Sequence, residues 1–214
     1  MVKSPGEDTA TTPRAYGGVP SGERRARRRA ALLDAALDLL AEEGSAAVTK
    51  RAVCARAKLN DRYFYEQFTD RDALLTTLVE EHTGAGIATV VAATHAAEPD
   101  THSQVHAAAD AALGFLLDDP RRHALLLNAH STEALQRARL TTQHAIARAM
   151  ATVSRELHPT PVAPLDTDMA AYVVVSGTLE LVAAWLRGEF DTTRAHLTDL
   201  IARQLLQAES VTGA

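Results

Sequence analysis

The chain has 214 residues, of which 46% are hydrophobic, so it is long enough to bury a substantial core in one or two domains. Its net charge of −5 argues against a histone-like protein that coats nucleic acid. The single cysteine, Cys54, excludes an internal disulfide and a cysteine-built zinc site. Every apolar run is too short for a membrane span, and the N-terminus lacks the apolar core of a signal peptide, so we expect a cytoplasmic protein.

The charge is unevenly distributed along the chain. Residues 1–72 carry 13 basic and 11 acidic residues, whereas residues 73–214 carry 9 and 16. This asymmetry allows a nucleic-acid surface that is confined to the first third of the chain.

The N-terminal segment, residues 1–21, is rich in glycine, proline, serine and threonine and predicts a disordered tail. Such a tail is either inert or an arm that enters a DNA minor groove. An amphipathic helix follows and ends at Gly44. Five arginines between Arg24 and Arg29 crowd its N-terminus, where the helix dipole is already positive. They indicate either contact with a polyanion or an ordinary solvated surface.

Two short helices joined by a tight link are predicted next, over about residues 49–57 and 61–68. Thr49 and Asn60 are placed to cap them. Phe64 and Phe68 lie four residues apart and should point together into the core. A short helix held rigid in this way can present its outer face to a DNA major groove.

The outer face of the second short helix should carry Arg62 and Tyr63. Arginine is well suited to reading base edges in the major groove. The alternative for Tyr63, and for its neighbour Tyr65, is simple packing against the core. A third helix should start after Thr69, in a motif similar to a capping box.

This region resembles the N-terminal signature of TetR/AcrR-type bacterial transcription regulators over about residues 24–75. The resemblance rests on Val48-Thr49, Val53-Cys54, Ala57, Leu59-Asn60, Phe64-Tyr65, Phe68 and the run from Asp70 to Leu74. It implies an all-α fold of about nine helices. Residues 22–72 would form a helix-turn-helix DNA-binding domain, and residues 73–210 a helical domain for effector binding and dimerisation.

The resemblance also implies roles for individual residues. Thr49, Tyr65 and Arg71 would contact phosphates, and Asp61, Arg62 and Tyr63 would approach base edges. Lys58 stands where the family usually has glycine, so it must take up the turn conformation at some strain, and its charge could gain a phosphate contact. The complete expected DNA-binding set is Arg24, Thr49, Lys50, Lys58, Asn60, Asp61, Arg62, Tyr63, Tyr65 and Arg71.

The remainder of the chain predicts six further helices and no strand. Their expected ranges are 70–95, 101–118, 120–130, 132–157, 166–187 and 193–208. The helix over 166–187 is apolar nearly all round, which is typical of a helix buried on every side. We expect burial against a second copy, as the resemblance also implies, and an ordinary intrachain core is the alternative. The expected interface residues are Tyr172, Val175, Leu179, Val182, Leu197 and Ile201.

The candidate effector site is less well defined by the sequence. Phe115 is expected in a cavity between the helices, together with His106 and His130. His102, His106 and Asp110 share a helix face, but alanines flank them rather than supporting acids, so we expect no metal site and no cofactor. No catalytic arrangement can be argued from the spacing, and an enzyme is not expected.

These observations predict a homodimeric transcription regulator, most simply a repressor that a small-molecule effector releases from a palindromic double-stranded operator. The alternative is an all-helical module that binds small molecules or proteins and has lost DNA binding. A metal-dependent helical enzyme using His102 and His106 is a third possibility.

Overall fold

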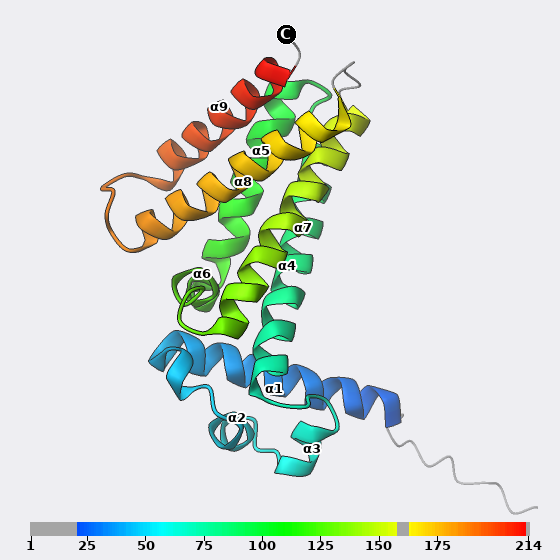
Figure 1. Cartoon of the computed structure of the whole chain (residues 1–214), viewed down its shortest axis with the longest axis vertical. Helices are drawn as coiled ribbons and strands as arrows, with labels where there is room; N and C mark the ends of the chain where they lie inside the picture. The colour runs from blue at the N-terminus through cyan, green and yellow to red at the C-terminus, as the bar shows by residue number, and fades with distance from the viewer. Residues whose placement is uncertain (1–20, 158–162, 213–214) are drawn as a thin grey trace, which may run out of the picture.

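The computed structural model describes residues 21–157 and 163–212, and these residues form helices without a strand (Figure 1). The predicted all-α fold is therefore confirmed. The expected N-terminal arm and the proline-rich linker at 158–161 lie outside the described residues. The elements are α1 (Ser21–Glu43), η1 (Ser45–Ala47), α2 (Lys50–Arg56), α3 (Asp61–Tyr65), α4 (Arg71–Ala96), α5 (Thr101–Asp118), η2 (Pro120–Arg122), α6 (His123–Leu127), α7 (Glu133–Leu157), α8 (Pro164–Leu186) and α9 (Arg194–Thr212).

The first three α-helices form a small unit at one end of the molecule (Figure 1). Its core contains leucines from α1 together with Val53, Phe64 and Phe68, and the start of α4 closes it with Leu74 and Leu78. Phe64 is completely buried and Phe68 is 4% exposed. The two phenylalanines therefore pin the short helices to α1, as their spacing predicts.

Local hydrogen bonds explain where the short helices begin. The Thr49 side chain accepts from the Ala52 amide at 3.2 Å, and the Asn60 side chain accepts from the Tyr63 amide at 3.3 Å. Each bond satisfies an amide that the first turn of a helix leaves without a partner. Helix α3 ends at Tyr65, three residues earlier than expected, because the Gln67 amide bonds the Phe64 carbonyl and tightens the chain into a turn.

The link between α2 and α3 passes through Lys58, whose φ of 54° lies in the left-handed region. Among the described residues, Lys58 is the one non-glycine with positive φ. The strained turn that the sequence predicted at this position is present. A lysine there costs more conformational energy than glycine, and its side chain extends outward and exposed.

Five long helices, α4, α5, α7, α8 and α9, build the larger domain above this unit (Figure 1). Helix α4 starts in the small unit and runs into the larger domain, where it packs against α5 and α7. Helices α8 and α9 lie side by side on the far part of the domain (Figure 1). Helix α4 thus connects the two parts of the molecule as one continuous rod.

Four of the expected interface residues are buried within their own chain. Val182, Leu197 and Ile201 are buried together in a core formed by α5, α8 and α9. Val175 is 6% exposed and packs with alanines of α7.

Helix α8 nevertheless keeps an open apolar face. Leu165, Met169 and Val173 follow one another at four-residue spacing and are 67%, 59% and 69% exposed. Among the described residues, α8 is also the one helix with the length and apolar composition of a membrane span, yet only 28% of that apolar stretch is buried within the chain. Much of its apolar surface is therefore left without a covering element.

Candidate nucleic-acid interface and ligand cavity

Most of the residues expected to touch DNA are exposed on the small unit. Arg24, Thr49, Lys58, Asn60, Asp61, Arg62 and Tyr65 are exposed, whereas Lys50, Tyr63 and Arg71 are partly buried. Tyr65 is 59% exposed although its ring meets Phe64 edge to face at 5.7 Å. A large aromatic side chain in this position can reach a partner outside the chain.

Lys50 bridges the two helices of the helix-turn-helix. Its Nζ lies 2.5 Å from Oδ2 of Asp61 and 5.0 Å from the centre of the Tyr65 ring. The hydrogen bond to Asp61 raises the pKa of Lys50, so the lysine stays charged. The pair fixes α2 against α3, and it also offsets part of the positive charge that would face a phosphate.

Tyr63 is held between the small unit's helices rather than pointing freely outward. The guanidinium carbon of Arg28 lies 4.5 Å from the centre of its ring. Glu66 binds three arginines. Its carboxylate lies 3.6 Å from Arg28 and 3.2 Å from Arg62, and its backbone oxygen accepts a hydrogen bond from Arg25 at 3.0 Å. Arg28 and Arg25 therefore orient α3 from α1, a role that the arginine run by itself does not reveal.

Arg71 is the first residue of α4, and its side chain hydrogen-bonds to backbone carbonyl groups. Its Nε donates to the Val48 carbonyl at 2.6 Å, and Nη2 donates to the Ser45 carbonyl at 2.5 Å. The side chain thus ties the first turn of α4 to the segment just before α2. Any phosphate contact by Arg71 would have to use its remaining N–H groups, two on Nη1 and one on Nη2.

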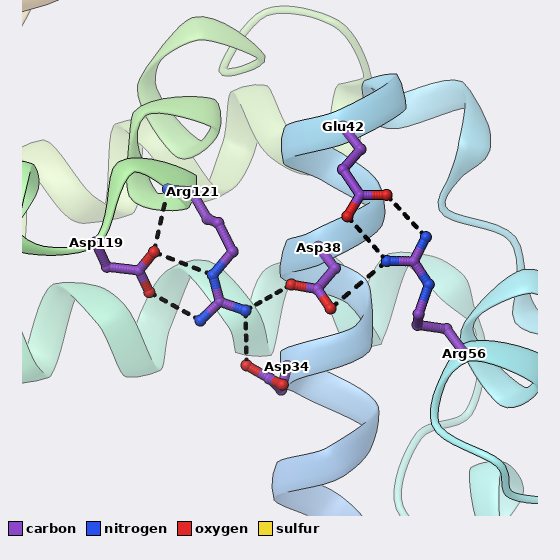
Figure 2. A network of polar contacts seen from close by, with 6 residues as sticks. All are labelled: Asp34, Asp38, Glu42, Arg56, Asp119 and Arg121. Carbon is purple, nitrogen blue, oxygen red and sulfur yellow. Dashed lines mark hydrogen bonds and ion pairs between the residues drawn. The ribbon is translucent and has the colours of Figure 1, made fainter.

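A network of charges joins the small unit to the larger domain (Figure 2). Arg121, in η2, binds Asp119 at 2.9 Å and reaches across to α1, where it meets Asp38 at 2.6 Å and Asp34 at 2.9 Å. The Arg121 guanidinium holds the pKa of Asp119 below its ordinary value. These contacts connect the end of α5 with the middle of α1.

The same network extends to the helix-turn-helix through Asp38. Arg56, the last residue of α2, lies 3.5 Å from Asp38 and 2.8 Å from Glu42 (Figure 2). Hydrogen bonding to Arg56 lowers the pKa of Glu42. The ion pairs of Arg121 and Arg56 with Asp38 therefore connect a movement of η2, through α1, to α2. The sequence carries one signal for it, because Arg121 and Arg122 open a helical segment where the dipole disfavours cations.

The larger domain encloses a cavity of about 350 Å³, which is within the range of small-molecule sites. Its wall comes mainly from α4, α5, α7 and α8, with α9 at one end. Most of the surface is apolar. The polar side chains that interrupt it include His82, Thr94, Gln104, Arg122, Arg139 and Glu180. The buried Oε1 of Gln104 has no hydrogen-bond partner among the described residues.

Phe115 lies on the cavity wall, where the sequence predicted it. His106 and His130 do not line the cavity, so their expected placement is corrected. His106 faces α9 and lies 3.3 Å from Asp199, and His130 is exposed in the turn after α6. The histidine on the wall is His82, whose Nδ1 is 2.9 Å from the Leu78 carbonyl.

The His102, His106 and Asp110 face does not come together as a metal cluster. Asp110 is bound to Arg194 at 2.7 Å, while His106 turns toward Asp199. Within the part of the chain that the structure describes, no group of three His, Cys, Asp or Glu side chains is placed to hold an ion. Cys54 is buried in the core of the small unit, and this burial raises the pKa of its thiol.

The comparison with protein families gives one match: the model for bacterial regulatory proteins of the TetR family fits residues 32–78. This region spans most of α1, the helix-turn-helix and the start of α4. No curated protein matches the chain closely enough to count as a relative.

Solved structures show the same fold over most of the chain. A TetR-family regulator from Mesorhizobium loti is 18% identical, with a TM-score of 0.68, and the match covers 89% of this chain and 99% of that one. The fatty acid degradation regulator FadR from Bacillus halodurans is 16% identical, with a TM-score of 0.66 and coverage of 84% and 94%. FadR from Bacillus subtilis, solved in complex with stearoyl-CoA, is 14% identical, with a TM-score of 0.65 and coverage of 84% and 98%.

The family match and the fold support DNA-binding transcription regulation. Residues 32–78 match the TetR family model, and the solved structures show that most of the chain has the TetR-like fold. The resemblance that the sequence suggested is thus confirmed.

Proposed function

We propose that the chain is a homodimeric repressor whose N-terminal unit, residues 22–72, reads a near-palindromic operator. Residues 73–210 would hold a small-molecule effector and form the dimer in the bacterial cytoplasm. The observation that carries this proposal is the course of α4. It is tied to the helix-turn-helix by Arg71 and lines the cavity from Val79 to Thr94. One rigid element therefore has an end in each site.

The DNA contacts would divide into two kinds. Thr49, Lys58, Tyr65 and the arginines from Arg24 would position the protein on phosphates, and these contacts carry no sequence information. Arg62 is 84% exposed in its side chain and would read a base edge from α3. Asn60 and Asp61 would approach the groove beside it. Tyr63, covered on one side by Arg28, would support Arg62 more than it reads bases.

The open face of α8 supports the dimer. A two-fold axis would bring Leu165, Met169 and Val173 of one protomer against the same residues of its partner, as self-complementary interfaces do. Tyr172 and Leu179 border this face and are partly buried. The dimer would then place two α3 helices in successive major grooves, about 34–36 Å apart.

Release from DNA would be a shift in population. An effector that binds more tightly to the conformation whose α3 spacing does not fit the operator lowers the affinity for DNA. The motion would pass along α4 and through the Arg121–Asp38–Arg56 contacts. The stearoyl-CoA complex of the Bacillus subtilis protein supports a small-molecule effector for this fold.

The proposal is tested by a gel shift of the full-length protein with DNA from upstream of its coding sequence. We expect a salt-sensitive band that specific DNA competes away and a shuffled duplex does not. Arg203→Ala, which removes an exposed arginine of α9 in the part of the larger domain away from the helix-turn-helix (Figure 1), serves as the control and should bind normally. A helical module without DNA binding would give no such band.

A further inference from the structure

Arg122 is a charged side chain on the cavity wall, and part of its hydrogen-bonding capacity is unused. It lies on the cavity wall and also on a polar groove between α1 and η2. Its Nη1 donates to the Phe115 carbonyl, and its guanidinium carbon is 4.0 Å from the centre of the Phe115 ring. Its Nε is buried and has no hydrogen-bond partner among the described residues.

No carboxylate lies within ion-pair distance of Arg122 in residues 21–157 and 163–212. Asp119 is close enough for Arg122 to help lower its pKa, but its two oxygens are engaged by Nε and Nη2 of Arg121. The other arginine of the cavity, Arg139, is paired with Glu180. The wall therefore presents one arginine that has no ion-pair partner among the described residues, and a partly buried cation of this kind favours an anionic partner.

The rest of the cavity is long and apolar. Along α4 its wall extends from Val79 to Thr94, a rise of about 22 Å for an α-helix. Valines and alanines make up much of its surface, and Phe115 narrows it where a side chain at Gly86 would come within 3.2 Å of the phenylalanine ring. Such a shape accepts an unbranched apolar tail.

We propose that the effector is a long-chain organic carboxylate whose head group binds Arg122. This inference rests on the proposal that the cavity holds an effector, and it assigns the chemical class of that effector. The carboxylate would accept from the Arg122 guanidinium, of which Nη1 alone has a hydrogen-bond partner among the described residues, and the apolar tail would lie along α4. A compact head is favoured over a polyphosphate, because the groove behind Arg122 carries the carboxylates of Asp34, Glu81 and Asp119.

The head group would also meet the connection to the helix-turn-helix. Arg122 is adjacent in sequence to Arg121, and both belong to the three-residue helix η2. A ligand that displaces Arg122 would therefore also displace Arg121, which binds Asp34 and Asp38 of α1. The apolar tail alone would not reach these contacts.

The test measures binding of three probes to the full-length protein by isothermal titration calorimetry: hexadecanoate, its methyl ester and hexadecanoyl-CoA. We expect hexadecanoate to bind roughly 10- to 100-fold more tightly than the ester, the size of a charge-assisted hydrogen bond. Arg122→Gln should remove this preference and leave ester binding unchanged. Arg187→Gln, the matched control outside the cavity, should keep it.

Equal binding of acid and ester, no binding of hexadecanoate, or an unchanged preference in Arg122→Gln would overturn the proposal. Tighter binding of hexadecanoyl-CoA than of the free acid would overturn the compact head group. The comparison of the three probes on the unaltered protein decides the question even if Arg122→Gln does not fold. Because no DNA enters this assay, its failure is distinct from a failure of operator binding in the gel shift.

Discussion

The small unit and the larger domain are packed in different ways. In the small unit, large side chains such as Leu32, Leu37 and Phe64 are excluded from solvent almost completely and hold very short helices in place. In the larger domain the helices are long, and much of their contact runs through alanines such as Ala147 and Ala151. Small side chains leave space between helices, and the domain retains a cavity.

This difference matches the two tasks of a ligand-controlled DNA-binding protein. Base reading requires a helix that is fixed to within a fraction of an ångström, which dense packing provides. A ligand site requires space and helices that can shift against one another. The two regions are connected by α4 with Arg71, by the charges around Arg121, and by the packing of Ala124, Leu135 and Ala138 against the core of the small unit.

The largest effect is expected when a phenylalanine is removed from the small unit. Phe64→Ala should lower the free energy of unfolding by about 3–5 kcal/mol, because it leaves a void where no solvent enters. Phe115→Ala makes the same chemical change beside an existing cavity, and we expect less than about half that loss. Urea unfolding of both variants measures the difference. Equal losses would mean that the two regions are packed alike.

The second effect concerns the open face of α8. Val173→Glu should weaken the dimer by at least about tenfold, because two-fold symmetry would bring the two carboxylates close together in an apolar contact. Leu127→Glu changes a 44%-exposed leucine of α6 and should leave the association unchanged. Sedimentation equilibrium measures both. A Val173→Glu protein that still dimerises fully would exclude this face.

A third change separates reading from positioning within the small unit. Arg62→Ala should relax the preference at particular base pairs by about 1–3 kcal/mol, while binding to unrelated DNA falls only slightly. Arg24→Ala should instead weaken binding to all sequences and reduce its salt dependence. Selection of binding sites from random duplexes measures the preference. An unchanged consensus with Arg62→Ala would refute its place in the groove.

A fourth change tests the polar connection. Arg121→Gln leaves three carboxylates without their common cation, and we expect a loss of about 1 kcal/mol, since the guanidinium is partly solvated. Arg155→Gln removes a single pair with Asp168 and should cost less. Thermal unfolding compares them. If the two variants are equally stable, the network around Arg121 does not hold the regions together.

The smallest expected effect is a pH dependence of stability that arises from His123, the first residue of α6. Burial lowers the pKa of His123 below its ordinary value of 6.5, and its Nε2 has no partner among the described residues. As the pH falls below 6.5, the unfolded chain takes up this proton before the folded one does, so stability decreases. His123→Leu should flatten this pH dependence between pH 6.5 and 5, whereas His130→Leu, at an exposed site, should not. Urea unfolding at several pH values measures it.

The sequence predicted those features that short-range chemistry determines. The caps at Thr49 and Asn60, the shared direction of Phe64 and Phe68, and the turn at Lys58 each depend on residues a few positions apart. The ends of the long helices follow from prolines and glycines between them. These signals sufficed for the fold and for the starts of the two short helices.

Features that depend on distant residues did not follow from the sequence. An all-apolar α8 indicated burial but could not distinguish burial by α5, α7 and α9 from burial by a partner. In the structure, one side of α8 packs within its own chain and another side is exposed. His106 and His130 shared a helix with cavity residues but face away from the cavity. The carbonyl partners of Arg71 lie more than 20 residues away in sequence.

The proposed dimer holds two reading units on one operator. Footprinting of the full-length protein on its selected DNA tests this most directly. We predict two protected half-sites related by a dyad, with their centres one helical turn, about 34–36 Å, apart. A single protected half-site, or protection without sequence preference, would contradict the claim.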